Sequence, residues 1–233
     1  MPATLKPWLY ALMLLDLGVL IAHMVLGSAT GASWSFFDVT RDGGLAEVVG
    51  YAKLALVIGM LGGRAFRLKD WSFTVWTALC TTLLLDDIVG IHEQMGVVIA
   101  RGLGLPRFLL HLRGRDIGEI IYLAGVASLT LLILGLAWRR AGRHVRRANL
   151  DLVLAAGIVA MCGIGFDALH EGWRSPRAPR EFLALLEDYG ELVAMTGLVA
   201  AAHAASASGL SRPAAWVRLR ERLLDASAAP RAA

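Results

Sequence analysis

The sequence predicts an all-α integral membrane protein with six transmembrane helices. Of its 233 residues, 57% are hydrophobic and only 18% are charged, whereas soluble domains contain about 25% charged residues. The mean hydropathy is +0.59, and the apolar residues fall into six blocks of about 20 residues, the length at which a helix crosses a membrane. This composition excludes a disordered chain, a collagen-like fibre and an ordinary water-soluble enzyme.

The six blocks cover residues 8–27, 45–63, 71–92, 116–138, 151–171 and 184–205. The first block is longer than the apolar region of a secretory signal, which has about 7–15 residues, and it contains Asp16, so we expect a retained helix. The sequence predicts a membrane domain over residues 1–210 and a basic cytoplasmic tail over 211–233. Residues 97–112 are expected to form an amphipathic or re-entrant segment at the membrane surface.

The distribution of Lys and Arg predicts the orientation. Fourteen lie in the N-terminus, the loops 62–70 and 139–149 and the tail, against eight in the other loops. Cytoplasmic loops are enriched in basic residues, so both termini are expected to be cytoplasmic in a bacterial-type inner membrane. Most acidic residues lie at the opposite, periplasmic end of the spans. No nucleic-acid-binding motif accompanies the basic residues, so no nucleic-acid partner is expected.

An internal repeat relates the third to sixth spans. In each copy one helix ends in His-Glu, a loop follows, and the next helix begins with Asp-x-Gly-Glu. The copies are the hairpins 71–138 and 151–205, and they predict a pseudo-two-fold four-helix bundle. The glycine of each motif allows a neighbouring helix to approach closely. The motif residues are His92, Glu93, Asp116 and Glu119 in the first copy, and His170, Glu171, Asp188 and Glu191 in the second.

The repeat brings acidic and histidine side chains to one end of the bundle. A charge at membrane depth is costly unless it is paired, hydrated or bound to a metal ion. Two histidines with at least four carboxylates from four helices resemble the ligand inventory of di-iron and di-manganese carboxylate bundles. The Glu-x-x-His spacing of those bundles is matched only by Asp167-x-x-His170. Such donors favour Fe or Mn, with Zn as another possibility.

The expected roles of these residues differ with their position. The expected metal ligands are Asp87, His92, Glu119, Asp167, His170, Glu187 and Glu191. The expected catalytic bases are Glu93 and Glu171, with Asp86, Asp116, Asp188 and Glu47 in supporting positions. Other interpretations stay open, because acids at helix N-termini can serve as caps and the histidines can pair with carboxylates without a metal.

Two further charge patterns call for partners. Asp16 and Lys53 both fall near mid-membrane, where an ion pair is the simplest expectation and a proton path an alternative. Seven arginines in 93–115 and 172–183 lie on the expected outer side, against the general trend. They would bind an anionic lipid headgroup or substrate, or they would form salt bridges with the outer carboxylates.

The sequence therefore favours a metal-dependent membrane enzyme with its site at the periplasmic membrane boundary. A di-iron or di-manganese oxidoreductase acting on a lipid-soluble substrate is the first expectation, and a metal-dependent hydrolase of a lipid is the second. A cation or proton-coupled transporter and a non-catalytic subunit of a membrane complex are further alternatives. Partners beyond membrane lipids, including further subunits, stay open.

Overall fold

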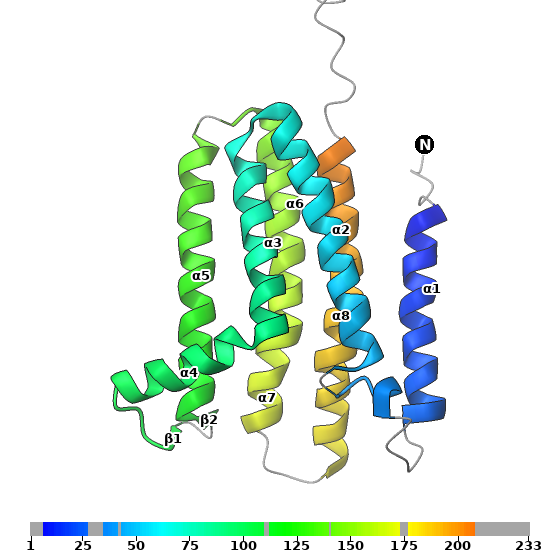
Figure 1. Ribbon diagram of the computed structural model, residues 1–233, viewed down its shortest axis with the longest axis vertical. Coiled ribbons are helices and arrows are strands. Elements are labelled where there is room, and N and C mark those ends of the chain that lie inside the picture. The colour runs from blue at the N-terminus through cyan, green and yellow to red at the C-terminus, as the bar shows by residue number, and fades with distance from the viewer. Residues whose placement is uncertain are drawn as a thin grey trace, which may run out of the picture.

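The computed structural model describes residues 7–27, 35–41, 43–109, 112–139, 141–172 and 177–207. Within these ranges the chain is helical apart from short connecting turns and one hairpin of two-residue strands (Figure 1). The elements in chain order are α1 (Pro7–Ala22), η1 (His23–Gly27), η2 (Ser35–Phe37), α2 (Leu45–Leu68), α3 (Trp71–Val89), α4 (Ile91–Gly102), β1 (Phe108–Leu109), β2 (Leu112–Arg113), α5 (Gly114–Trp138), α6 (Arg143–Ala160), η3 (Met161–Gly165), α7 (Phe166–Gly172) and α8 (Arg177–Ala207).

The chain is an all-α, multi-pass membrane protein with five candidate spans in its described part. These are Pro7–Leu26, Leu45–Leu68, Trp71–Val89, Gly114–Trp138 and Arg143–Leu169. They coincide with five of the six predicted blocks. The sixth block lies in α8, which also runs the length of the bundle (Figure 1). Acidic residues at 187, 188 and 191 leave α8 with a shorter apolar stretch, so it does not qualify by hydropathy alone.

The long helices run in alternating directions (Figure 1). We call the inner end the one at which α2 connects to α3 and α5 connects to α6, and α1 begins and α8 ends at this same end. The outer end contains α4, the β1–β2 hairpin and α7. The alternation agrees with the predicted order of the spans, and it places both ends of the described chain at the inner end.

The third span is shorter than the sequence predicts. The carboxylate of Asp70 accepts a hydrogen bond of 2.9 Å from the Ser72 N–H and caps the start of α3. Gly90 ends the helix with a φ of 66°, a left-handed conformation that favours glycine. The expectation of one helix over 71–92 is therefore wrong at its end. His92 and Glu93 lie instead in the first turn of α4.

The buried core does not consist of the two predicted hairpins alone. Most of it lies between α2, α3, α6 and α8, whereas α5 packs at the edge against α3 and α4 and adds Leu134 to the core. The expected four-helix core of the third to sixth spans is thus corrected, because the second span replaces the fourth. The core residues are Leu54, Val57, Leu61, Phe73, Trp76, Cys80, Leu134, Ala148, Leu152, Leu198, Val199, Ala202 and Ala205.

Polar contacts within this core tie the helices together near the inner end. The Trp76 Nε1–H donates a 3.0 Å hydrogen bond to Oδ1 of Asn149, which joins α3 to α6. The Arg64 guanidinium donates a 3.0 Å hydrogen bond to the Ser206 carbonyl and lies 4.9 Å from the Phe73 ring centroid. These contacts join α2 to α3 and α8. They also provide partners for buried polar groups, which are costly to bury without a hydrogen bond.

Two glycines allow α4 to cross α5 at the outer end. A Cβ atom on Gly118 would overlap the carbonyl of Gly96, and a Cβ on Gly96 would lie 2.8 Å from the Arg115 carbonyl. The glycine of the Asp-x-Gly-Glu motif thus permits a close helix approach, as its position suggested. The equivalent Gly190 of α8 faces Cys162, whose Sγ would lie 3.3 Å from an added Cβ.

Replacing Gly118 by alanine is expected to destabilise the outer end. Alanine normally stabilises a helix interior by about 1 kcal/mol relative to glycine, but here the new methyl group would push α4 away, at a net cost of about 1–3 kcal/mol. Thermal unfolding in detergent should show a lower Tm. Gly125→Ala is the control on the same helix, because nothing lies within 4 Å of its Cβ position. Equal Tm values for the two variants would contradict the close contact.

Candidate functional site

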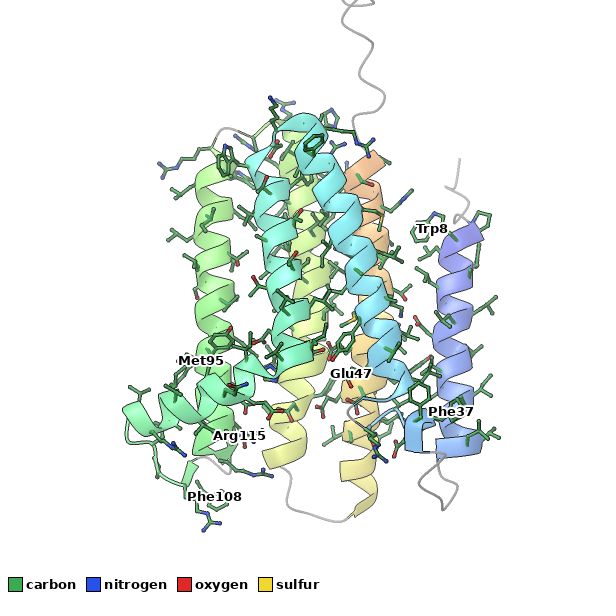
Figure 2. All side chains as sticks on the ribbon, viewed as in Figure 1. Trp8, Phe37, Glu47, Met95, Phe108 and Arg115 are labelled. Atoms are coloured by element: carbon green, nitrogen blue, oxygen red, sulfur yellow. The ribbon has the colours of Figure 1, made fainter. Side chains whose placement is uncertain are left out.

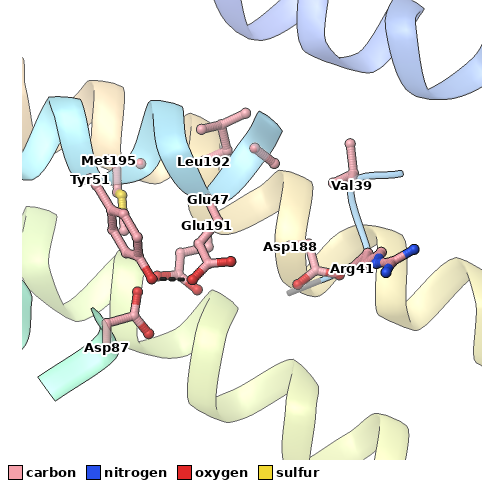
Figure 3. A pocket seen from close by; sticks show the side chains of 11 residues that line it. Val39, Arg41, Glu47, Tyr51, Asp87, Asp188, Glu191, Leu192 and Met195 are labelled. Carbon is pink, nitrogen blue, oxygen red and sulfur yellow. Dashed lines mark hydrogen bonds between the residues drawn. The ribbon is translucent and has the colours of Figure 1, made fainter. Parts of the chain in front are cut away.

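Carboxylates from three helices meet in a pocket at the outer end of the bundle. Glu47 comes from α2, Asp87 from α3 and Glu191 from α8, and their side chains point into the same space (Figure 3). The pocket has a volume of about 160 Å³. Its lining residues are Val39, Arg41, Ala46, Glu47, Gly50, Tyr51, Asp87, Asp188, Glu191, Leu192 and Met195. Four carboxylates and one guanidinium make this an acidic pocket.

Local hydrogen bonds on α2 hold Glu47 in the pocket. The Tyr51 hydroxyl donates to one Glu47 oxygen, and the backbone N–H of Gly43 donates to the other. Tyr51 follows Glu47 by four residues, so both side chains lie on one face of the helix. Asp87 reaches towards the same hydroxyl from α3 (Figure 3). The tyrosine therefore lies between two carboxylates of different helices.

The position of Glu191 depends on a π-helical turn in the neighbouring helix. A Cβ on Gly163 of η3 would lie 2.7 Å from Oε2 of Glu191, so the carboxylate rests directly on the glycine backbone. Single π-helical turns occur frequently at functional sites. Asp87 and Asp188 both act on Glu191 electrostatically. Because like charges in a half-buried site repel each other, the pocket is suited to a cation.

On the inner side of the pocket, a buried ion pair joins three helices. The Lys53 ammonium donates to Asp16 and, at 2.8 Å, to the carbonyl of Leu192. The Thr196 hydroxyl donates a 2.6 Å hydrogen bond to the other Asp16 oxygen. The ion pair expected between Asp16 and Lys53 is present, with both residues at most 2% exposed. It connects α1, α2 and α8 one residue from Glu191.

A second polar group lies beside the pocket at the junction of α3 and α4. The Nδ1 atom of His92 lies 3.1 Å from Oδ2 of Asp86. Asp86 is only 4% exposed, and its Oδ1 has no hydrogen-bond partner among the described residues. His92 also interacts electrostatically with Asp87. His92, an expected metal ligand, thus pairs with a carboxylate. This agrees with the interpretation in which the histidines pair with carboxylates without a metal.

Glu93 and Glu119 do not line the acidic pocket. The Arg115 guanidinium donates a 2.7 Å hydrogen bond to Glu119 on the same helix, α5, and lies 3.5 Å from Glu93 of α4. Both acids are therefore paired with Arg115, and the salt bridge with Glu93 crosses from α5 to α4. Asp116 accepts a 3.0 Å hydrogen bond from the Arg113 backbone N–H. This is an N-terminal capping interaction for α5. The first copy of the motif therefore stabilises the outer end.

The remaining expected metal ligands and bases either do not line the acidic pocket or have side chains outside the described residues. Asp167 lies in α7 and Glu187 in α8, and neither lines the acidic pocket. The side chains of His170 and Glu171 lie outside the described residues. Within the part of the chain that the structure describes, no three His, Cys, Asp or Glu side chains form a preformed metal-binding group. The metal ligands proposed from sequence remain predictions.

Sequence reasoning missed Tyr51, Gly163 and the basic Arg41 of the pocket. Tyr51 could have been found from its spacing of four residues from Glu47, which places both on one helix face. The contact between Gly163 and Glu191 carries no local signal, because it depends on how α8 packs against the π-helical turn.

These features define a multi-pass helical membrane protein with a carboxylate-lined pocket at one end of its bundle. The chain belongs to the family described as Domain of unknown function (DUF8692), whose model matches residues 19–206. The matched range includes every residue of the acidic pocket. No curated protein and no solved structure matches the chain.

Loss of one partner of the buried ion pair is expected to destabilise the protein strongly. Lys53→Met would leave the Asp16 carboxylate buried without its counter-ion, at a cost of about 3–5 kcal/mol. The double variant Lys53→Met, Asp16→Leu removes both charges and should recover part of that loss. Unfolding midpoints in detergent provide the measurement. A single variant as stable as the unmodified protein would be incompatible with this role of the pair.

Proposed function

We propose that this protein is a metal-dependent integral membrane enzyme and that the acidic pocket is its cation-binding site. The observation that carries the proposal is the convergence of Glu47, Asp87 and Glu191 from three different helices on one pocket. Such convergence brings negative charges together at a cost that a bound cation would remove. A purely structural role would be met more simply by pairing each acid with its own basic residue.

The donor chemistry favours a hard divalent ion. Glu47, Asp87 and Glu191 offer only oxygen atoms, and the Tyr51 hydroxyl adds another. Carboxylate oxygens suit Mg, Ca and Mn, and a carboxylate-rich site also suits Fe. Mn and Fe, which can also change oxidation state, are therefore favoured over Zn, which cannot. The ion would draw the carboxylates inward from their present positions, since they repel each other without it.

One metal ion fits the described residues better than two. The expected ligands His92 and Glu119 are engaged by Asp86 and Arg115. A second ion would require donors from α7, where His170 and Glu171 remain candidates from the sequence. A mononuclear centre held by the acidic pocket is accordingly the first form of the proposal, and the dinuclear centre is its extension.

The surroundings of the pocket favour a lipid-soluble substrate. The pocket lies near the outer end of a bundle whose exterior is apolar, and α2 beside it exposes Val48 and Leu56. Oxidation of such a substrate is the favoured reaction class. Hydrolysis of a lipid is the alternative, in which Asp188, the fourth carboxylate of the pocket, would act as the base towards a metal-bound water. Glu93 lies outside this pocket, 3.5 Å from the Arg115 guanidinium.

The inner end is proposed to face the cytoplasm of a bacterial-type inner membrane. The last turn of α2 contains Arg67, the connection to α3 contains Lys69, and α6 begins with several arginines at the same end. Basic loops remain on the cytoplasmic side during insertion. The acidic pocket would then open towards the periplasmic boundary, and both termini would be cytoplasmic.

A cation or proton-coupled transporter is the second candidate, and one contact favours it. Leu192 lines the acidic pocket, and its carbonyl accepts a hydrogen bond from Lys53. The pocket and the buried ion pair are therefore adjacent. In a transporter, two adjacent polar sites of this kind would begin a pathway for the ion or proton into the membrane. Mn²⁺ uptake into proteoliposomes distinguishes the two candidates, because an enzyme site would bind the ion without carrying it.

Metal binding to the purified protein tests the proposal. Protein prepared without chelator in detergent should bind about one Mn²⁺ or Fe²⁺ per chain, and Glu191→Gln should weaken binding at least about tenfold, because a charged ligand typically contributes more than 1.4 kcal/mol. Elemental mass spectrometry and titration with MnCl₂ give the stoichiometry and the Kd.

Asp151→Asn is the matched control, because Asp151 is an exposed acid on α6 outside the pocket. It should bind Mn²⁺ like the unmodified protein. Folded wild-type protein that binds no divalent ion, or equal binding by the Glu191→Gln variant, would contradict the proposal.

A further inference from the structure

A second pocket at the outer end has the opposite charge. It lies between the end of α4, the β1–β2 hairpin and the start of α5, and its volume is about 660 Å³. Four arginines line it, and no described acidic residue does. The arginines are Arg101, Arg107, Arg113 and Arg115, and Phe108 lies beside them. We call it the basic pocket.

Three of the four arginines of the basic pocket, Arg101, Arg107 and Arg115, differ in their contacts. Arg115 forms salt bridges with Glu119 on its own helix and with Glu93 on α4, and the second of these joins α4 to α5. Arg101 and Arg107 are exposed and form no salt bridge with a described carboxylate. Arg107 lies 5.8 Å from the ring centroid of Phe108, which directs its guanidinium towards the hairpin. Two guanidinium groups are therefore available to an anion.

The basic pocket lies at the depth at which lipid headgroups are expected. Phe108 and Arg115 lie further towards the outer end than Glu47 (Figure 2). Around the pocket, Val98, Leu103 and Phe108 have exposed fractions of 60%, 62% and 49%. Exposed apolar side chains beside arginines are typical of segments that lie in the interface between acyl chains and headgroups.

We propose that the basic pocket binds the phosphate of an anionic phospholipid from the surrounding leaflet. Guanidinium groups bind phosphate oxygens in a bidentate geometry that lysine does not reproduce, and all four basic residues here are arginines. The acyl chains would lie along α5, which starts in the pocket and exposes Ile121, Leu129 and Leu132. This inference goes beyond the proposed function and does not depend on it, because it uses a different pocket with different residues.

The lipid site also accounts for an exception in the charge distribution. Arginines on the outer side oppose the usual enrichment of basic residues in cytoplasmic loops. Salt bridges explain Arg115, but they do not explain Arg101 and Arg107. An anionic headgroup supplies the missing counter-charge, and it would anchor α4 and the hairpin to the membrane surface.

Native mass spectrometry of the detergent-released full chain tests this inference. Titration with phosphatidylglycerol should show one lipid bound more tightly than phosphatidylcholine. The double variant Arg101→Gln, Arg107→Gln should bind phosphatidylglycerol about tenfold more weakly, because it loses two charge-assisted contacts, with no change in phosphatidylcholine binding. Mn²⁺ binding should remain unchanged in this variant, so a failure here is distinguishable from a failure of the metal site.

The matched control is Arg139→Gln, Arg143→Gln, which removes two exposed arginines at the inner end. It should bind the tight phosphatidylglycerol molecule like the unmodified protein. Equal weakening in both double variants would overturn the proposal in favour of general charge attraction. Displacement of the lipid by inorganic phosphate at a similar concentration would also overturn it, since the pocket would then bind phosphate without regard to the lipid.

Discussion

The buried ion pair between Lys53 and Asp16 is the interaction on which the outer end depends. A lone ammonium or carboxylate at this depth would be unstable, so α1 and α2 must face each other where the two residues meet. Lys53 also bonds the Leu192 carbonyl, which fixes the register of α8 against α2. Glu47 and Tyr51 lie towards the outer end of α2 from Lys53, and Glu191 precedes Leu192. The ion pair thus places the acidic pocket.

The outer end combines two sites of opposite charge that share one support. Gly90 ends α3 and redirects the chain into α4, and Gly96 lets α4 cross α5 at Gly118. This crossing brings Arg115 close to both Glu93 and Glu119. The basic pocket forms between the end of α4, the β1–β2 hairpin and the start of α5. Asp87, near the end of α3, lines the acidic pocket instead. The turn at Gly90 therefore separates the acidic pocket from the basic pocket.

The sequence predicts much of the fold because apolar block length and charge placement are local signals. Five spans, the alternating order and the partners Asp16 and Lys53 follow from them. The packing order of the helices does not, since every span is apolar and lipid is as apolar as a neighbouring helix. This is why α2 was not predicted in the core and α5 was not predicted at its edge.

The candidate site shows the same division. Acids clustered at the outer end were visible in the sequence, and the Asp-x-Gly-Glu motif correctly marked glycines at helix contacts. The motif did not reveal which acids share a pocket. Glu119 and Glu191 occupy equivalent places in the two copies, yet Arg115 neutralises only the first. The residue that corresponds to Arg115 in the second copy is Glu187, an acid, and Glu191 lines the acidic pocket.

The location of a bound metal ion tests the central claim most directly. Crystals grown with MnCl₂ and measured at the manganese absorption edge should give one anomalous peak between Glu47, Asp87 and Glu191. A strong peak elsewhere, for example beside Glu93 and Glu119, or an empty acidic pocket at saturating Mn²⁺, would contradict the assignment of this pocket as the cation site.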